Sequence, residues 1–565
     1  MDQQRTATPI SVDPIDAFHL YDTTLRDGSQ QEGLTLSVTD KLAVARHLDE
    51  LGVTYIEGGW PGAVPRDTEF FARARTELDL RCARLAAFGA TRKAGVKVED
   101  DPQVTALVES EAPTVTLVAK SDLRHVTAAL RTSGEENLAM VRDTVVHLVG
   151  LGREVIVDAE HFFDGFLHDP DYTTAVIAES FAAGAAVTVL CDTNGGMLPH
   201  QVTETIEDLR SRLAALGHGE ARLGVHTHND SGCAVANALT AVRAGITHVQ
   251  GCINGYGERT GNADLLTMLA DLQLKMGVHL VPAESLADAT RIAHAIGEIV
   301  NMPVSPRAPY VGASAFAHKA GLHASAIRVD PDLYQHMDPR EVGNDMRMII
   351  SDMAGRASIE LKGRELGFDL AGQKNLLARL AGTVKQREAE GYSYEAADAS
   401  FELLLLDEMG RVPRYFEVES WRASSHQLRD GTLETEATVK LKGSATNDGA
   451  EGASAAPTSG ARSVALAEGN GPVNALDLAL RKALRGRYPL IDELELQDFK
   501  VRILDAHHGT DATTRVLVRT AGADLEFTTV GVGPNVIEAS WEAISDAYTY
   551  GLYKAGITPP APGLG

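Results

Sequence analysis

Two histidines in the segment Val225–Asp230 have the spacing of metal ligands. His226 and His228 end a short apolar run that is typical of a β-strand, and in an extended chain residues i and i+2 point to the same face. Both imidazoles can therefore bind one divalent cation. A second apolar run, far upstream, ends near the carboxylate of Asp27. If the two strands belong to one barrel their ends meet, and the sequence then predicts an Asp/His/His metal site.

Two more polar residues stand beside this predicted site. Asn262, in the loop Gly257–Asn262, can add an amide oxygen, although asparagine in such a loop also serves to form a turn. Arg26 can stabilise a developing oxyanion or enolate, or can hold the barrel rim as a salt bridge. Two imidazoles, a carboxylate and an amide oxygen suit Mn²⁺, Zn²⁺, Co²⁺ or Mg²⁺, and the residues do not choose among these metals.

Short β-rich runs alternate with helix-like segments between about residues 18 and 277. The predicted strands are His19–Leu25, Val53–Glu57, Arg84–Phe88, Thr114–Ala119, Glu154–Ala159, Val187–Cys191, Arg222–His226 and His248–Ile253. Eight strand–helix alternations over roughly 250 residues are typical of an α/β fold of the (β/α)8 TIM-barrel type, which we predict for residues 16–281. An open doubly wound sheet is the alternative. It usually has a Gly-rich phosphate turn after its first strand, which Arg26–Ser29 does not form.

Two further regions follow the predicted barrel. Residues 282–411 lose the β pattern and are predicted to form helical linker subdomains. Residues 412–556 have a mixed pattern that predicts an α+β domain, with amphipathic helices at Asn474–Leu484 and Val536–Tyr550. Small polar residues at 443–460 predict a flexible insertion in that domain.

Composition restricts the partners of the chain. Its 565 residues include 78 acidic and 52 basic side chains, a formal charge of −26, so nucleic acid is not expected as a partner. No apolar run approaches the ~20 residues of a membrane span, so no membrane partner is expected. The first residues resemble no signal peptide, and the four cysteines are far apart with no CxxC pair. We therefore expect a cytoplasmic protein with reduced thiols.

Three motifs together resemble one enzyme family: Asp22–Gly28 (DTTLRDG), His226–Asp230 (HTHND) and Gly257–Asn262 (GERTGN). Their order and spacing are similar to those of the acyl-CoA-condensing aldolase-type barrels, which are the isopropylmalate, citramalate and homocitrate synthases and their lyase relatives. The resemblance covers the whole chain, because Gly469–Leu476 and Thr529–Val532 are similar to the C-terminal regulatory domain of the synthases. Lyases and carboxylase barrels lack that domain.

The resemblance implies a role for each candidate residue of the barrel. A divalent metal would be bound by Asp27, His226, His228 and Asn262. Arg26 would stabilise the charge that forms on a 2-oxo acid or on an enolate. Glu160, at the end of the fifth predicted strand, would orient the substrate or a metal-bound water. Thr193, after the sixth, would donate a hydrogen bond to the carboxylate of the oxo acid.

Two catalytic residues are implied outside the barrel. His323, in the segment Gly321–Ala326, matches the catalytic histidine of the synthases, and Tyr334 matches a tyrosine that family members place with it. In the family this segment reaches over the barrel of a partner subunit. The resemblance therefore implies a homodimer.

Two segments, Tyr55–Gly62 and Asp158–Gly165, look most like the citramalate-synthase branch of the family. This branch implies the substrates pyruvate and acetyl-CoA, an acyl transfer that ends in thioester hydrolysis, and a place in isoleucine synthesis. Asp158 stands where an apolar substrate-binding residue is expected, which leaves the choice of oxo acid open. The alternative within the family is an isopropylmalate synthase that acts on 2-oxoisovalerate in leucine synthesis.

The region after about Pro413 carries no acid, base or metal cluster suited to catalysis. By resemblance it is expected to dimerise and to bind a branched-chain amino acid as a feedback effector, with isoleucine the expected one. A non-catalytic amino-acid sensor is the alternative of another class. It predicts loss of the metal and charge residues, and these are all present.

Overall fold

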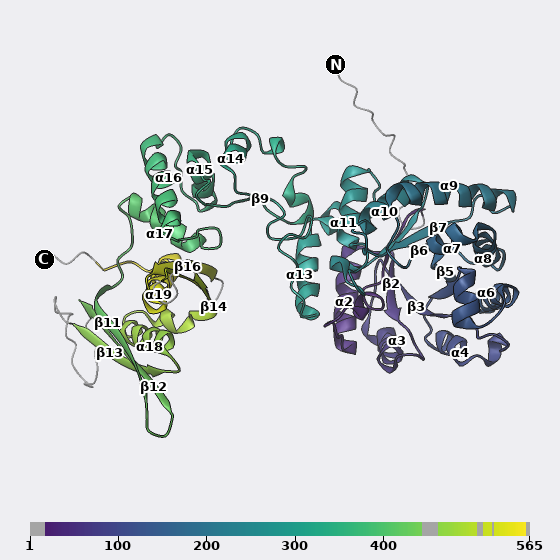
Figure 1. Cartoon of the computed structure of the whole chain (residues 1–565), viewed down its shortest axis with the longest axis horizontal. Coiled ribbons are helices and arrows are strands. Elements are labelled where there is room, and N and C mark those ends of the chain that lie inside the picture. Colours follow the sequence, from purple (N-terminus) through teal and green to yellow (C-terminus); the bar gives the residue numbers. More distant parts are fainter. Residues whose placement is uncertain (1–16, 443–461, 505–511, 523–524, 561–565) are drawn as a thin grey trace, which may run out of the picture. The chain divides into compact units, whose positions relative to one another are not determined.

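The structure is a computed structural model. It describes four stretches of the chain: 17–442, 462–504, 512–522 and 525–560 (Figure 1). The chain divides into two compact units. The first holds the residues up to Phe316 together with Met337–Asp345, and the second holds Ala317–His336 and the residues from Met346 onward. Among the described residues, every helix is too short or too polar to cross a membrane.

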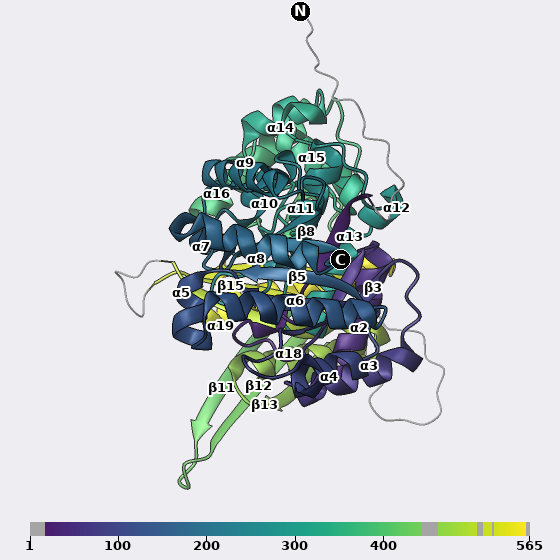
Figure 2. The same ribbon diagram turned by 90° about the vertical axis from the view of Figure 1, so that its right-hand side faces the viewer.

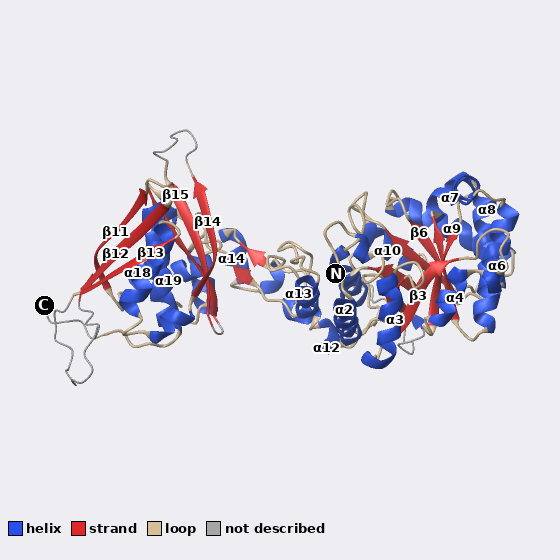
Figure 3. Ribbon diagram, turned by 90° about the horizontal axis from the view of Figure 1, so that it is seen from below, coloured by secondary structure: helices blue, strands red, loops and turns tan. Residues whose placement is uncertain are grey.

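Eight parallel strands of the first unit close into a barrel that helices surround (Figure 3). The strands are β1 (His19–Asp22), β2 (Tyr55–Gly59), β3 (Arg84–Ala90), β4 (Thr114–Lys120), β5 (Glu154–Glu160), β6 (Val187–Asp192), β7 (Leu223–Thr227) and β8 (His248–Gly251). Their order follows the chain, and β1 pairs with β8 to close the ring. The predicted (β/α)8 barrel is therefore confirmed. Its parallel strands bring all their carboxyl ends to one rim.

Twelve α-helices are described in the first unit, and the bounds of α2 follow local sequence signals. Their bounds are α2 (Val38–Leu51), α3 (Pro65–Glu77), α4 (Pro102–Glu109), α5 (Leu123–His125), α6 (Gly134–Gly150), α7 (Phe162–His168), α8 (Pro170–Ala182), α9 (Pro199–Ala215), α10 (Ala234–Arg243), α11 (Leu265–Ala270), α12 (Ala283–Leu286) and α13 (Ala289–Ile299). In α2, Ser37 and Asp40 form a capping box, and Gly52 ends the helix at φ 92°, a left-handed conformation that favours glycine.

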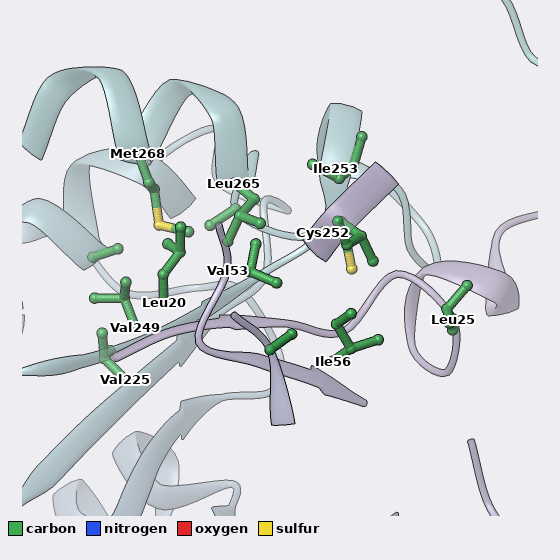
Figure 4. Packing of buried hydrophobic residues seen from close by; sticks show 14 of the residues in the cluster. Leu20, Leu25, Val53, Ile56, Val225, Val249, Cys252, Ile253, Leu265 and Met268 are labelled. Atoms are coloured by element: carbon green, nitrogen blue, oxygen red, sulfur yellow. The ribbon is translucent and has the colours of Figure 1, made fainter. Parts of the chain in front are cut away.

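Side chains along β1 alternate between two apolar clusters. Leu20 points outward and packs with Val249 and with Met268 of α11 (Figure 4). Tyr21 points inward and belongs to a separate cluster inside the barrel, together with Tyr55. This period of two is that of a strand buried on both faces.

The second unit begins with helices and continues into two antiparallel sheets. Its helices are α14 (Gly321–Ile327), α15 (Arg356–Glu365), α16 (Lys374–Ala389), α17 (Asp398–Glu408), α18 (Pro472–Leu484) and α19 (Val536–Lys554). Its strands are β9 (Ala317–His318), β10 (Arg347–Met348), β11 (Glu417–Gln427), β12 (Leu433–Lys442), β13 (Ser463–Gly469), β14 (Glu495–Ile503), β15 (Thr514–Gly522) and β16 (Leu525–Gly533). Helix α18 packs on β12 and β13, and α19 packs on β15 and β16 (Figures 1 and 2). The predicted sequence of barrel, helical region and α+β domain is confirmed. The predicted insertion at 443–460 lies outside the described residues, as does the first residue of the predicted 16–281 domain.

Candidate functional site

Three buried side chains meet at the carboxyl rim of the barrel: Asp27 after β1, His226 in β7 and His228 just after it. Nε2 of His226 lies 3.1 Å and Nε2 of His228 lies 3.5 Å from Oδ2 of Asp27. The two Nε2 atoms are 3.0 Å apart. All three candidate ligand atoms lie within 4.8 Å of one another. One cation with metal–ligand distances of about 2.0–2.2 Å can therefore reach all three.

Asn262 completes this cluster. His228 and Asn262 form an isolated antiparallel bridge, which holds the asparagine beside the histidine. Its Nδ2 donates to Oδ2 of Asp27 at 2.9 Å, whereas its Oδ1 is buried with no hydrogen-bond partner among the described residues. A buried oxygen in that state needs a partner. With two imidazoles and a carboxylate beside it, the set of donor atoms fits a divalent metal.

Electrostatics keeps Asp27 ionised. Burial would raise the pKa of Asp27, but the charge of Arg26 and the hydrogen bonds of His226 and His228 hold it well below its usual range. Burial would likewise lower the pKa of His226, but its hydrogen bond to Asp27 raises it. The carboxylate therefore has the charge that a cation requires.

His226 is oriented from behind by a glutamine that was not among the predicted site residues. Oε1 of Gln250, in β8, lies 2.8 Å from Nδ1 of His226. An amide oxygen only accepts, so Nδ1 carries a proton, and in the neutral imidazole Nε2 then holds the lone pair that a metal requires. Nε2 of Gln250 in turn donates to Oδ1 of Asp158 at 3.0 Å. No local sequence pattern indicates this contact, because Gln250 becomes the β8 partner of His226 only through the strand register of the closed barrel.

Replacing Gln250 with leucine is expected to raise the metal dissociation constant ~10–100-fold, because His226 loses the acceptor that fixes its tautomer. Direct titration of the metal-depleted protein with Mn²⁺ or Zn²⁺ measures this constant. Gln427→Leu, at an exposed position, is the matched control. Equal affinity in both variants would contradict the role of Gln250.

Asp158 lies inside the barrel, behind the candidate ligands. Burial raises its pKa to about 7, and the nearby carboxylate of Glu57 adds to the effect. The predicted part of Asp158 in binding the oxo acid stays a prediction. Its side chain accepts a hydrogen bond from Gln250.

Arg26 is held rigidly next to Asp27. Its Nε donates to Oε1 of Glu57 at 2.6 Å, and its guanidinium carbon lies 3.8 Å from the centre of the Phe88 ring. Tyr21 donates to the other oxygen of Glu57 at 2.9 Å, which fixes that carboxylate. Burial opposes the charge of Arg26, but Glu57 and then Asp27 raise its pKa, so the cation persists. Glu57 was not among the predicted site residues.

Glu160 and Thr193 lie at the ends of neighbouring strands, as expected. Glu160 forms an ion pair with Lys120, the last residue of β4, which was not predicted. Oγ1 of Thr193 accepts from the backbone N–H of His161 at 2.8 Å, so its hydroxyl proton can be donated to a ligand. His161 has φ 59°, in the left-handed region that a histidine seldom adopts. Such strain is common at functional sites.

Arg259, in the Gly257–Asn262 loop, ties the cluster to the loop after β6. Its NH2 group donates to the carbonyl oxygen of Thr193 at 2.9 Å and lies 2.8 Å from Nδ1 of His228. Its Nε donates to Asp230 at 2.8 Å. The loop motif was visible in the sequence, but this role of the arginine depends on a contact that spacing alone does not predict.

His323 and Tyr334 belong to the second unit, where the structure brings them together. Their rings are stacked with centroids 4.1 Å apart, and the ring of His318 lies 6.2 Å from that of His323. Tyr334 is 40% exposed. The structure therefore places this histidine and tyrosine together, with Tyr334 at the surface of the second unit.

Known proteins resemble the chain over nearly its whole length. The HMGL-like family model matches residues 17–296, the homocitrate synthase post-HMGL domain-like model 310–390, and the LeuA allosteric (dimerisation) domain model 395–552. An (R)-citramalate synthase of Streptomyces coelicolor is 59% identical over 96% of this chain and 98% of its own length. One from Aquifex aeolicus is 45% identical over 95% and 98%. A 2-isopropylmalate synthase of Pyrococcus furiosus is 29% identical over 94% and 98%. The chain belongs to the (R)-citramalate synthase family of HMGL-like proteins.

Proposed function

We propose that this protein is a condensing acyltransferase that joins acetyl-CoA to pyruvate and releases (R)-citramalate and CoA. The observation that carries this proposal is the closed cluster of Asp27, His226 and His228 beside the rigid cation of Arg26. The (R)-citramalate synthases at 59% and 45% identity support the choice of reaction. The presence of all these residues argues against a non-catalytic sensor.

A divalent metal is proposed to bind Asp27, His226, His228 and Asn262. When bound, it would polarise the carbonyl of the oxo acid as a Lewis acid. Gln250 orients His226 for this task, and Arg259 contacts His228. The donor set accepts Mn²⁺, Zn²⁺, Co²⁺ or Mg²⁺.

The remaining residues bind substrates and move one proton. Thr193 is proposed to donate its hydroxyl to the carboxylate of pyruvate, and Glu160, paired with Lys120, to orient substrate or water. His323, with Tyr334 stacked on it, is assigned the removal of a proton from the acetyl methyl group.

Carbon–carbon bond formation follows proton removal. The resulting enolate carbon attacks the carbonyl carbon of pyruvate, and the negative charge moves to the carbonyl oxygen. Arg26 is assigned the stabilisation of that alkoxide, because Glu57 and Phe88 hold its guanidinium in place before the charge forms. The alkoxide takes up one proton, which balances the proton removed from the acetyl methyl group. Water then cleaves the thioester, which gives citramalate and CoA and makes the condensation irreversible.

Pyruvate is expected to be preferred over 2-oxoisovalerate by tens to hundreds of fold in kcat/KM, because each extra methyl or methylene group in a pocket changes binding by ~1–3 kcal/mol. A coupled assay of free CoA with pyruvate, 2-oxoisovalerate and 2-oxoglutarate in parallel tests the proposal. A preference for 2-oxoisovalerate would assign the protein to isopropylmalate synthesis instead.

The C-terminal α+β domain is proposed to bind isoleucine and to form a homodimer, in keeping with the matched LeuA allosteric (dimerisation) model. Coupling of ~1–3 kcal/mol between effector and active site predicts inhibition of about 5–150-fold at saturating isoleucine. Initial rates with isoleucine, leucine and valine measure the coupling. An enzyme that ignores all three amino acids would show that the domain has another purpose.

A further inference from the structure

A buried lysine joins three elements of the second unit. Lys362, on α15, has only 1% of its side chain exposed. Its Nζ lies 2.7 Å from Oε1 of Glu365 on the same helix and 2.8 Å from Oδ2 of Asp398, the first residue of α17. A buried ammonium group is costly unless it is paired. The position of α17 on α15 is therefore defined by this ammonium and its two carboxylates.

Glu365 extends the contact to the short strand β10. Its second oxygen, Oε2, accepts from the backbone N–H of Met348 at 3.2 Å. Strand β10 pairs in parallel with β9, and Met348 of β10 is the partner of His318 of β9. The N–H of Ile349 donates to the carbonyl oxygen of His318 at 2.8 Å. One carboxylate thus holds both Lys362 and the backbone of the strand pair.

The side chain of Met348 supports the helix that carries His323. It packs in a small buried cluster with Ala324 and Ile327 of α14 and with Leu361 of α15. Leu361 directly precedes Lys362, so the apolar cluster and the ion pairs share the same turn of α15. A shift of this turn relative to β10 would move α14, and His323 with it.

The same contacts continue from α17 to the C-terminal helix α19. Glu402, one turn after Asp398 on α17, is buried. Its Oε2 accepts from the hydroxyl of Tyr550 at 2.7 Å, and its Oε1 accepts from Nζ of Lys554 at 3.0 Å, both on α19. Helix α17 is therefore held on α19 by one buried carboxylate and on α15 by another carboxylate that pairs with Lys362.

We propose that Lys362 is a positioning residue for the reaction: its two ion pairs tie the His318–His323 segment to α17, and through α17 to the C-terminal domain. The kinetic part of this inference rests on the proposed role of His323. Continuity of direct contacts within one compact unit supports it, since every step from Lys554 to α14 is a hydrogen bond, an ion pair, a shared helix or a packed side chain.

Lys362→Met in the full chain tests the proposal. Methionine keeps the length and apolar body of the side chain, and the two carboxylates left behind are 34% and 38% exposed, so water can solvate them and the variant should fold. Lys385→Met, on the exposed side of α16, is the matched control. Asp398→Asn, which leaves Lys362 paired with Glu365, is the second variant should Lys362→Met fail to fold.

Two measurements are made on each protein: amide hydrogen exchange of residues 317–327 and steady-state kinetics with pyruvate. We expect ~10-fold faster exchange and ~10-fold lower kcat in Lys362→Met, with KM for pyruvate unchanged and the control like wild type. Unchanged exchange would overturn the proposal. Faster exchange with unchanged kcat would also overturn it, because the ion pairs of Lys362 would then have a purely structural role. A wild type without activity on pyruvate would refute the proposed function, while the exchange data would still decide whether Lys362 ties the segment to α17.

Discussion

Replacing Asp27 with alanine is expected to lower kcat/KM for pyruvate more than ~100-fold, with little recovery on adding metal. Loss of a group that merely orients a metal ligand costs ~10–100-fold, so loss of a charged ligand should cost more. The carboxylate contacts both imidazoles and Asn262, and its replacement also leaves the two histidines without their shared partner. Initial rates over a series of metal concentrations measure the effect.

The control for this variant is His279→Asn, because His279 is exposed and is not a candidate ligand. Its rate should equal that of wild type. His226→Ala should behave like the Asp27 variant, since it removes another member of the same cluster. Wild-type activity that survives complete removal of metal by a chelator would contradict the metal site.

Arg26→Lys is expected to lower kcat ~10²–10³-fold, the loss seen when one donor to a developing oxyanion is removed. Lysine keeps the charge but cannot donate to Glu57 and stack on Phe88 at the same time, as the planar guanidinium does. Because the interaction forms mainly in the transition state, kcat and kcat/KM should fall together. Steady-state kinetics in pyruvate at saturating acetyl-CoA separates the two constants.

Two companion variants sharpen this result. Glu57→Gln should lower kcat in the same direction, since it removes the charge that orients Arg26 while keeping an acceptor oxygen. Arg307→Lys, at an exposed position, should have no effect. A raised KM with unchanged kcat in Arg26→Lys would assign Arg26 to ground-state binding of pyruvate.

The barrel was predictable because its strands are short, apolar and regularly interrupted by helices. The end of the first strand was less so: the run His19–Leu25 was expected, whereas β1 ends at Asp22. There the carboxylate of Asp22 accepts from the N–H and the hydroxyl of Thr24 and turns the chain. This turn aims Arg26 and Asp27 into the rim, an outcome that propensity alone does not predict.

His226 and His228 lie together because the period of two along an extended chain points both side chains to one face, whereas Asp27 and Asn262 reach them from loops. The side chains that orient them follow no local pattern. Gln250 and Glu57 act through contacts between strands, so their roles depend on the register and curvature of the closed barrel. Arg259 depends on the conformation of a loop. A sequence read by itself contains the motif but not these contacts.

The predicted boundary between the helical region and the C-terminal domain, at residues 411 and 412, stays a prediction. Helix α17 precedes it, yet Glu402 and Leu403 of this helix pack against Tyr550 of α19. The apolar residues of α17 lie all around the helix rather than in one stripe, as expected of a helix that other elements surround. Such a pattern does not tell which neighbours cover it.

The most direct test of metal-assisted condensation with pyruvate follows the carbonyl carbon itself. The full-length protein is incubated with acetyl-CoA, a divalent metal and pyruvate labelled with ¹³C at the carbonyl, and the reaction is followed by ¹³C NMR together with release of CoA. We expect the ketone signal to be replaced by that of a hydroxyl-bearing quaternary carbon, in equal amount to the CoA released, and a chelator to abolish both. Release of CoA with the ketone signal unchanged would contradict it, because the protein would then only hydrolyse the thioester.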